Sequence, residues 1–539
     1  MEKNHPIKLL SIIFFTGAVV LSLELLASRI LTPFFGVSLY IWTSILSVTL
    51  IFLAIGYQFG GWITSKMDSR YYEELFFFIP FVSSVFILIS TLTYPILLPG
   101  LINLNLLVGC FIGSSLLLAI PLVLMSSLNP ILISIIKNKD DQSSDSKSGF
   151  VLFISTIGSV FGVIFTALVL IPNLTNFSSF ILNAMFLIIY NLIIYFFIGY
   201  NSFKKLKKLF LFLNLILFFF LLTIFFYKKD YLNYFTSTKD EKNNSYTIVY
   251  ESPSFYGNLK VVDFRPNNLN DTSHYIFYQD GTMLNQVEKN GYSFSTYTYV
   301  LDALSQLSSR GDALVLGLGA GMNVKTLSSR GYNIDVVEIN PKVLTIAKKF
   351  FKYEDVKAKF FFEDARTYIR KCKKKYDLII VDLFLSDGIP EHLITKEFFK
   401  DLNNCLTNDG IIVSNSIMDF TNELALNTIL STYGSVFKNL YYFDQLNSKI
   451  ANLYIVTSNN SELDKKLYGF KPTFDYLPLK IKPDLNNILR RLIKFDKKNI
   501  NDKNILSDEN NKYSYIFAKN LQNYRKLIGS RTPSRFLMN

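Results

Sequence analysis

The sequence predicts a multi-pass α-helical membrane domain followed by a doubly wound α/β domain. Residues 1–227 are almost continuously apolar, whereas the second half alternates short apolar runs with amphipathic segments. One of these runs, 313–317, stops at a series of alternate glycines. Over the 539 residues, 50% are hydrophobic and 50 are Phe, a composition too apolar for a soluble protein of this length.

Seven apolar stretches in the first half are each long enough to span a bilayer. They are predicted at 7–31, 39–64, 75–98, 101–136, 150–171, 177–198 and 209–226. The fourth is too long for one straight crossing. Pro121 and Pro130 are expected to kink it, because proline removes a helical donor and clashes with the preceding turn.

The second half divides by composition into three parts. A polar linker is predicted at 228–245, where Lys, Asn and acids replace the apolar runs. The soluble domain then covers 246–464, with a small β-rich segment at 246–285 and a core at 294–464. From residue 465 on, the chain is a basic polar tail and is expected to be irregular.

The core alternates predicted strands and helices. Strands are expected at 313–317, 334–338, 359–362, 377–382 and 410–415, with helices between them at 322–329, 341–351, 365–371 and 396–406. This alternation is typical of a Rossmann-like, mostly parallel sheet that binds ligands at the carboxyl ends of its strands.

The glycine turn after the first of these strands indicates a nucleoside site. Gly317, Gly319 and Gly321 let the backbone approach a ligand, and Glu338 ends the next strand, where a carboxylate can accept both ribose hydroxyls. A dinucleotide motif would need glycine at Met322. A nucleoside with a sulfonium tail therefore fits better than NAD, and a plain tight turn is the remaining interpretation.

Further carboxylates follow the neighbouring strands at the same edge. Asp364 follows the third strand, Asp382 ends the fourth, and Asp387 lies in the non-helical run after it. Such a group can hold a cationic ligand and offer a base to a nucleophile. Asp364 can instead cap the helix that begins at Ala365, whereas the run after Asp382 favours a ligand or catalytic role.

An ordered series of motifs resembles the spermidine synthase (polyamine aminopropyltransferase) family, and most of all its bacterial branch with a fused membrane domain. The series is Glu251-Ser252-Pro253, Gln279-Asp280-Gly281, Gly317 to Gly321, Val337-Glu338-Ile339, Glu363-Asp364-Ala365 and Val381-Asp382 to Pro390. The resemblance covers about 246–457. The glycine turn alone has little specificity, and the order of the whole series gives the resemblance its weight.

The resemblance implies transfer of an aminopropyl group from decarboxylated S-adenosylmethionine to an amine, putrescine by family default, with release of methylthioadenosine. By this analogy the donor site comprises Gly317, Gly319, Gly321, Glu338, Asp364, Ala365 and Pro390. Asp382 would accept the proton of the attacking amine, and Asp387, Asp280 and Tyr297 would hold the acceptor. The donor acts as co-substrate, and no bound prosthetic group or metal is expected.

The chain departs from the family pattern at three polar positions. Ala320 stands where the soluble enzymes carry an aspartate, Thr298 follows Tyr297 in place of a histidine, and Gly257 stands in place of a glutamine. These positions belong to the acceptor side, so the resemblance defines the donor better than the acceptor. A larger, more apolar or membrane-delivered amine fits the membrane fusion as well as putrescine does.

Charge and cysteine content limit the possible partners. The net charge of +13 gathers at the ends of the apolar stretches and in the tail, which is typical of contact with anionic lipid headgroups. Nucleic acid is not expected, because no basic face interleaved with aromatics stands out. The three cysteines and three histidines show no disulfide or metal spacing. The expected partners are a small-molecule amine and the lipid bilayer, with a homodimer as an open alternative to a single chain.

Basic residues on alternate connections predict the orientation in a cell (inner) membrane. Lys66 and Arg70, Lys137 and Lys147, and the 204–208 lysines fall on one side, which places the N-terminus in the cytoplasm. Seven crossings would then leave the second half outside, where the nucleoside donor is not normally found. We expect a cytoplasmic catalytic domain, with one of the spans not crossing fully.

Two other functions remain open at this stage. A methyltransferase that uses intact S-adenosylmethionine would share the same core. A non-catalytic transporter or sensor would bind the nucleoside without turnover, although the spans carry few polar residues for such a role. The segment from Asp382 to Pro390 favours aminopropyl transfer.

Overall fold

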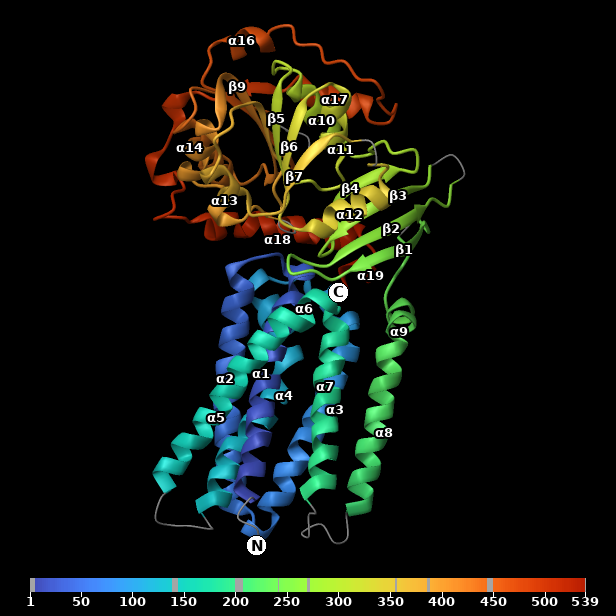
Figure 1. Ribbon diagram of the computed structural model, residues 1–539, viewed down its shortest axis with the longest axis vertical. Coiled ribbons are helices and arrows are strands. Elements are labelled where there is room, and N and C mark those ends of the chain that lie inside the picture. The colour runs from blue at the N-terminus through green and yellow to red at the C-terminus, as the bar shows by residue number, and fades with distance from the viewer. Residues whose placement is uncertain are drawn as a thin grey trace. The chain divides into compact units, whose positions relative to one another are not determined.

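The computed structural model describes residues 5–137, 144–198, 207–240, 242–268, 272–353, 356–384, 388–443 and 449–538. The chain folds into two compact units (Figure 1). We call Met1–Phe35, Leu39–Thr238 and Pro533–Asn539 the helical unit. Gly36–Ser38 and Lys239–Thr532 form the α/β unit.

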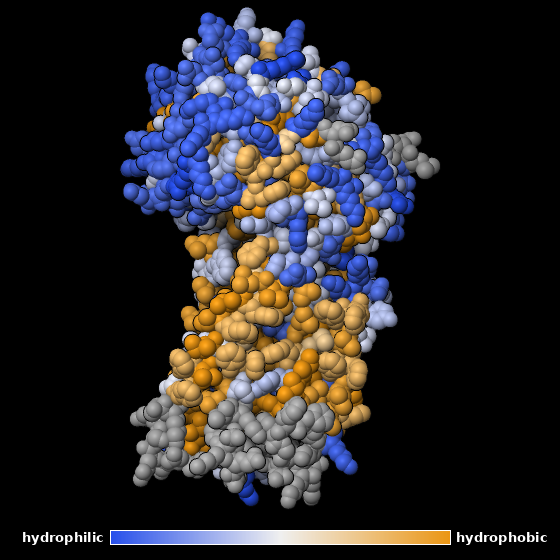
Figure 2. Space-filling view, viewed as in Figure 1, coloured by the Kyte–Doolittle hydropathy of each residue, from blue (hydrophilic) through white to orange (hydrophobic). Residues whose placement is uncertain are grey.

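The helical unit consists mostly of long apolar helices, together with a few short ones. They are α1 (His5–Phe35), α2 (Leu39–Lys66), α3 (Tyr72–Leu101), α4 (Leu106–Lys137), α5 (Ser144–Phe165), α6 (Ile171–Asn173), α7 (Asn176–Ile198), α8 (Lys207–Phe226) and α9 (Lys228–Phe235). A π-helical turn, Thr166–Leu170, joins α5 to α6. Seven helical segments in the described part of the chain are long and apolar enough to cross a membrane. Figure 2 shows the apolar surface over these helices, where Leu50 and Phe219 are 67% and 60% exposed.

The fourth apolar stretch forms one continuous helix, α4, with both Pro121 and Pro130 inside it. Glycines let neighbouring helices approach α4 and α1 closely. A Cβ on Gly56 or Gly60 of α2 would lie 2.4 Å from a backbone oxygen of α4, and one on Gly158 of α5 would lie 2.0 Å from the Phe14 oxygen of α1. These positions act as the small residues that permit backbone contact between membrane helices.

The α/β unit begins with a four-stranded antiparallel sheet in the order β1-β2-β3-β4. Its strands are β1 (Ser245–Ser252), β2 (Leu259–Arg265), β3 (His274–Gln279) and β4 (Thr282–Glu288). The helix α10 (Thr296–Ser305) follows the sheet. Leu259, Val261 and Phe277 of the sheet and Val300 of α10 are buried in one apolar core. The predicted β-rich segment therefore forms one side of the unit.

The second sheet has eight strands in the order β12-β10-β11-β9-β8-β5-β6-β7. The strands are β5 (Asp312–Leu316), β6 (Asn333–Val337), β7 (Ala358–Phe361), β8 (Tyr376–Val381), β9 (Leu406–Asp419), β10 (Asn439–Phe443), β11 (Ile450–Ser458) and β12 (Leu492–Lys494). The five neighbouring strands β7, β6, β5, β8 and β9 pair in parallel. The strands β11, β10 and β12 continue the sheet beyond β9 with antiparallel pairs. The predicted doubly wound, mostly parallel sheet is confirmed.

Four helices connect the parallel strands close to the positions predicted. They are α11 (Met322–Ser329), α12 (Pro341–Phe350), α13 (Ala365–Arg370) and α14 (Lys396–Asn404), and α15 (Glu423–Gly434) follows β9. Asn340, Asp364 and Thr395 accept hydrogen bonds from backbone N–H groups at the starts of α12, α13 and α14. The caps of α12 and α13 start these helices within a few residues of the ends of β6 and β7.

The chain after residue 465 is not irregular, contrary to expectation. It forms α17 (Lys482–Leu489), β12 and α18 (Tyr513–Arg531), and α16 (Glu462–Leu467) lies at its start. Leu485 of α17 and Phe517 of α18 are buried in the two apolar cores of the unit. Widely spaced apolar residues in a Lys- and Asn-rich sequence are enough to bury one face of each helix.

The predicted linker also contains regular structure. Its first part forms α9, in which Leu232 is buried, and the boundary between the units falls after Thr238. The short helix α19 (Ser534–Leu537) joins the helical unit. There the Arg535 Nε donates to Asn233 Oδ1 at 3.0 Å, and the Arg535 N–H donates to the Ser237 carbonyl at 3.1 Å.

Candidate active site

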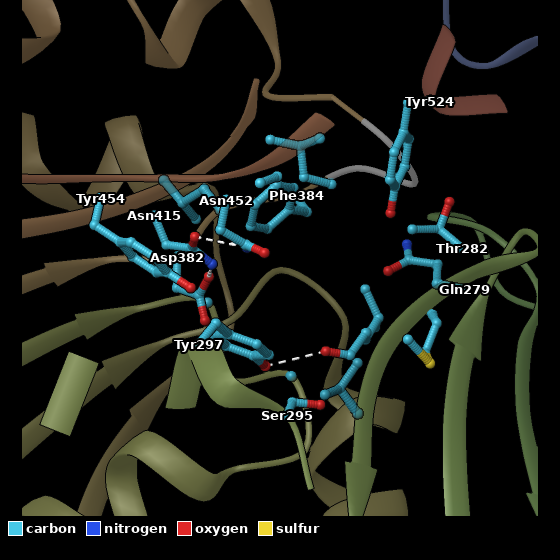
Figure 3. Close-up of a pocket in the computed structure, with 18 of the residues that line it drawn as sticks. Gln279, Thr282, Ser295, Tyr297, Asp382, Phe384, Asn415, Asn452, Tyr454 and Tyr524 are labelled. Atoms are coloured by element: carbon cyan, nitrogen blue, oxygen red, sulfur yellow. Dashed lines mark hydrogen bonds between the residues drawn. The ribbon is translucent and has the colours of Figure 1, made fainter. Parts of the chain in front are cut away.

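A cavity of about 910 Å³ lies in the α/β unit at the carboxyl ends of the parallel strands. Its lining includes the glycine turn after β5, the ends of β6, β7 and β8, and residues of β3, β4, β9, β11, α17 and α18. Figure 3 shows part of this lining. The position agrees with the general rule for ligand sites in open α/β sheets.

The glycine turn has a backbone conformation that favours glycine at every second position. Gly317, Gly319 and Gly321 have φ angles of +90°, +53° and +78°. A Cβ on Gly317 would lie 2.2 Å from the Asp382 carbonyl oxygen, and one on Gly321 would meet the ring of Tyr353 at 2.5 Å. Gly317 and Gly319 line the cavity, so the turn exposes backbone there rather than side chains.

Glu338 follows β6 and is bound to the glycine turn. Its Oε2 accepts a hydrogen bond from the Leu318 N–H at 3.0 Å, and its Oε1 accepts one from the Asn340 N–H at 2.9 Å. Burial raises the pKa of Glu338, and these backbone donors oppose the increase. The Ile339 N–H is a third backbone donor to this carboxylate.

Asp382 lies at the end of β8 on the floor of the cavity. The Asn415 Nδ2 donates to its Oδ1 at 2.9 Å, and the Asn323 Nδ2 donates to its Oδ2 at 3.2 Å. The Asn415 Oδ1 in turn accepts from the Asn452 Nδ2 at 2.9 Å. Burial raises the pKa of Asp382 to about 6, against the lowering effect of the two amides. The group is thus held rigidly and titrates near neutral pH.

Asp364 has two partners in the structure, a backbone N–H of α13 and the ring of His392. Its Oδ1 accepts from the Thr367 N–H at 2.9 Å and caps α13, and its Oδ2 lies 2.9 Å from the His392 Nε2. Burial alone would raise the pKa of Asp364, but the bonds from His392 and Thr367 lower it below its usual value. Ala365, Pro390 and His392 line the cavity beside it.

The three expected acceptor residues have different surroundings. Tyr297 lines the cavity and donates from its hydroxyl to the Leu284 carbonyl at 3.0 Å, and burial raises its pKa. Asp280 is not among the described lining residues, and its Oδ1 accepts from the Asn258 N–H at 2.9 Å. Asp387 lies outside the described residues.

Several lining residues were not predicted from the sequence. Asn415 and Asn452 hold or support Asp382, and the buried Tyr454 on β11 lies beside them (Figure 3). Asn323 of α11 also donates to Asp382 but is not among the described lining residues. Tyr524 comes from α18. Neutral polar residues within apolar strands form no motif, so only their alternation along the strand could have indicated which of them face the ligand side.

Part of the chain that forms this site is similar in sequence to known proteins. The family model described as "Spermine/spermidine synthase domain" matches residues 297–462. The chain is 34% identical over 137 residues to the polyamine aminopropyltransferase of Vibrio vulnificus, covering 24% of this chain and 44% of the relative. It is 33% identical over 130 residues to the N-terminal histidine N-methyltransferase of Emericella nidulans, covering 23% of each.

Among solved structures, the spermidine synthase of Thermotoga maritima aligns with a TM-score of 0.35 at 18% identity, over 44% of this chain and 87% of that one. The chain spans less than half the length of the two curated relatives above.

Proposed function

We propose that this chain, which carries a spermine/spermidine synthase domain over residues 297–462, is a membrane-embedded aminopropyltransferase. It transfers the aminopropyl group of decarboxylated S-adenosylmethionine to an amine and releases methylthioadenosine. The observation that supports this most directly is Asp382, a rigidly held carboxylate with a pKa of about 6, in the same cavity as the glycine turn and Glu338.

The chemistry requires only positioning and one proton acceptor. The lone pair of the neutral amine attacks the aminopropyl carbon next to the sulfonium, a C–N bond forms, and the C–S bond breaks with its electrons moving to sulfur. Asp382 accepts the proton that the acceptor ammonium must lose before its nitrogen has this lone pair. Glu338 binds the ribose hydroxyls, Asp364 the adenine amine, and Pro390 packs against the base. A sulfonium is already a good leaving group, so no covalent enzyme intermediate is needed.

Methyl transfer from intact S-adenosylmethionine is the second candidate, and the similarity to a histidine N-methyltransferase favours it. The experiment that separates the two functions incubates the purified full chain with each donor and a panel of amines. Mass spectrometry then identifies the by-product. Methylthioadenosine indicates aminopropyl transfer, and S-adenosylhomocysteine indicates methyl transfer. A nucleoside that binds without any by-product would instead support a sensor or transporter.

Asn415→Leu is expected to move the acidic limb of the rate profile to higher pH. The hydrogen bond from Asn415 stabilises the ionised form of Asp382 and lowers its pKa, so loss of this bond raises the pKa. The base is active when ionised, and the variant therefore needs a higher pH to reach half of its maximal kcat/KM. Unchanged methylthioadenosine affinity shows that the donor site is intact. An acidic limb at the wild-type pH would contradict the role of Asn415 as a positioning residue.

We further propose that the α/β unit faces the cytoplasm, because the nucleoside donor is made there. This proposal requires that an even number of the seven apolar segments cross the bilayer. The test uses a thiol reagent that does not cross membranes and two single cysteines in a Cys372→Ser background. Tyr468→Cys replaces a side chain that is 92% exposed in the α/β unit, and Ser69→Cys lies between α2 and α3.

Both cysteines should stay unlabelled in intact cells and react once the membrane is opened. Labelling of Tyr468→Cys alone in intact cells would show that all seven segments cross and that the domain is external.

A further inference from the structure

One side of the cavity is formed by β3, β4 and α18, and we assign this side to the acceptor. Its described lining residues offer neutral hydrogen-bonding groups and no carboxylate. Gln279 of β3 and Thr282 of β4 are directly paired across the two strands, so their side chains share one face. Both are buried, at 7% and 2% exposure, and both line the cavity. Tyr524 of α18 lies beside them, on the opposite side of the drawn cavity from Asp382 (Figure 3). We call these three residues the polar subsite.

The hydroxyl of Thr282 indicates that this subsite binds a ligand. Its hydroxyl is buried and has no hydrogen-bond partner in the described structure. A buried hydroxyl without a partner costs about 1–3 kcal/mol, so such groups are rare unless a ligand or water completes them. The Gln279 Nε2 donates to the Tyr256 carbonyl at 2.6 Å, which fixes the amide and leaves its oxygen as an acceptor toward the same region.

Hydrogen bonds and apolar packing hold α18 against the rest of the α/β unit, and the helix forms one wall of the subsite. The Asn523 Nδ2 donates to the Asp419 Oδ2 at 2.6 Å, and the buried Arg525 donates from Nη1 to the Asp280 carbonyl at 3.3 Å. Phe517 packs into the apolar core. The helix lies outside residues 297–462, which match the family model.

The charges around the cavity decide which acceptor fits. The carboxylates among the described lining residues are Glu338, Glu363, Asp364, Asp382 and Asp484, and none of them belongs to β3, β4 or α18. The α18 helix instead contributes a cation, Arg531, together with apolar Leu527. A second ammonium at this end would lose its hydration, and no carboxylate among the described lining residues of β3, β4 or α18 would replace it. Asp280 lies between β3 and β4, but it is not among those lining residues, and its Oδ1 accepts from the Asn258 N–H. The guanidinium of Arg531 in the same cavity would also repel an ammonium.

We propose that the acceptor is a monoamine with an uncharged hydrogen-bonding group at its far end, such as an amino alcohol, and not a diamine. The far group binds Gln279, Thr282 and Tyr524, the chain between runs along Met283, Leu284 and Leu527, and the reacting amine reaches Asp382. This inference rests on the proposed function for the identity of the reacting end. Recognition of the far end depends only on the subsite.

Binding tests the inference without requiring turnover. Calorimetry on the full chain with methylthioadenosine present compares amino alcohols, diamines and plain alkylamines of equal chain length, from three to six carbons. The amino alcohol of the best length should bind about tenfold more tightly than its matched diamine, the equivalent of one net hydrogen bond. Tighter binding of the diamine overturns the inference. Product analysis with the decarboxylated donor tests the proposed function separately.

Variants at one position separate recognition from damage to the fold. Thr282→Val should abolish the preference for the amino alcohol over the alkylamine, and Thr282→Ser should retain it. Thr282→Asp introduces a carboxylate and should reverse the preference toward the diamine, a gain that misfolding does not produce. Thr247→Val, an exposed threonine on β1 of the same sheet, serves as the control and should bind as the wild type does. An unchanged preference in Thr282→Val and Thr282→Asp would overturn the inference.

Discussion

Asp382→Asn is expected to lower turnover by on the order of 100-fold or more while leaving nucleoside affinity near the wild-type value. The variant keeps the shape of the side chain but removes the proton acceptor, and its neighbours Asn415 and Asn323 stay in place. Glu338 and Asp364, to which we assign donor binding, are unaffected. Steady-state rates and calorimetric titration with methylthioadenosine measure the two effects separately.

Raising the pH should partly restore the Asp382→Asn variant, because more of the acceptor amine arrives already deprotonated. In the wild type the rate should instead rise as the pH passes upward through about 6, where Asp382 ionises. Asp484→Asn is the matched control, since this lining carboxylate is exposed on α17 and far along the chain from β8. Full turnover in Asp382→Asn, or loss of donor binding, would refute the assigned role.

Glu338→Gln is expected to weaken methylthioadenosine binding by roughly 1–3 kcal/mol, because charge-assisted hydrogen bonds to the ribose become neutral ones. The structure adds a second reason. Both oxygens of Glu338 accept backbone N–H groups, from Leu318 and Asn340, and the amide nitrogen of glutamine would face one of these donors. The substitution would therefore displace the glycine turn in addition to removing the negative charge at position 338. Calorimetric titration measures the change in affinity.

Glu363→Gln controls for the loss of one negative charge in the same cavity. Glu363 lines the cavity near Asp364 and lies 3.5 Å from Lys371 in a partly exposed ion pair, which contributes little energy. It should bind methylthioadenosine about as well as the wild type does. Unchanged affinity in a folded Glu338→Gln protein would remove Glu338 from the donor site.

The core of the α/β unit was predictable because its strands end abruptly. The apolar run before Gly317 and the one before Glu338 stop within a residue of β5 and β6, and helix α11 has the bounds that were predicted for it. Parallel strands share one edge, so carboxylates that follow them in the sequence meet in space. For this reason Glu338, Asp364 and Asp382 were found from the sequence and do line one cavity, although their roles remain predictions.

The rest of the site was not predictable because its residues lie in segments without a strong pattern. Asn415 is within the long apolar strand β9, which runs four residues beyond the predicted end of that strand. Tyr524 is in a helix whose apolar positions are diluted by Lys, Asn and Gln. For Asp280, the motif resemblance suggests a ligand role. The structure shows its Oδ1 accepting from the Asn258 N–H, and the ligand role stays a prediction.

The order in which the two sides of the cavity are synthesised has a consequence for biogenesis. The glycine turn, Glu338 and Asp382 leave the ribosome well before α18, which follows them by more than a hundred residues of sequence. Because domains fold during synthesis from the N-terminal side, a nascent chain can form the proposed donor side of the cavity while α18 is still absent. During synthesis, the chain could then bind the donor before it can select an acceptor. A nucleoside bound at that stage would favour folding of the sheet on which α18 later docks.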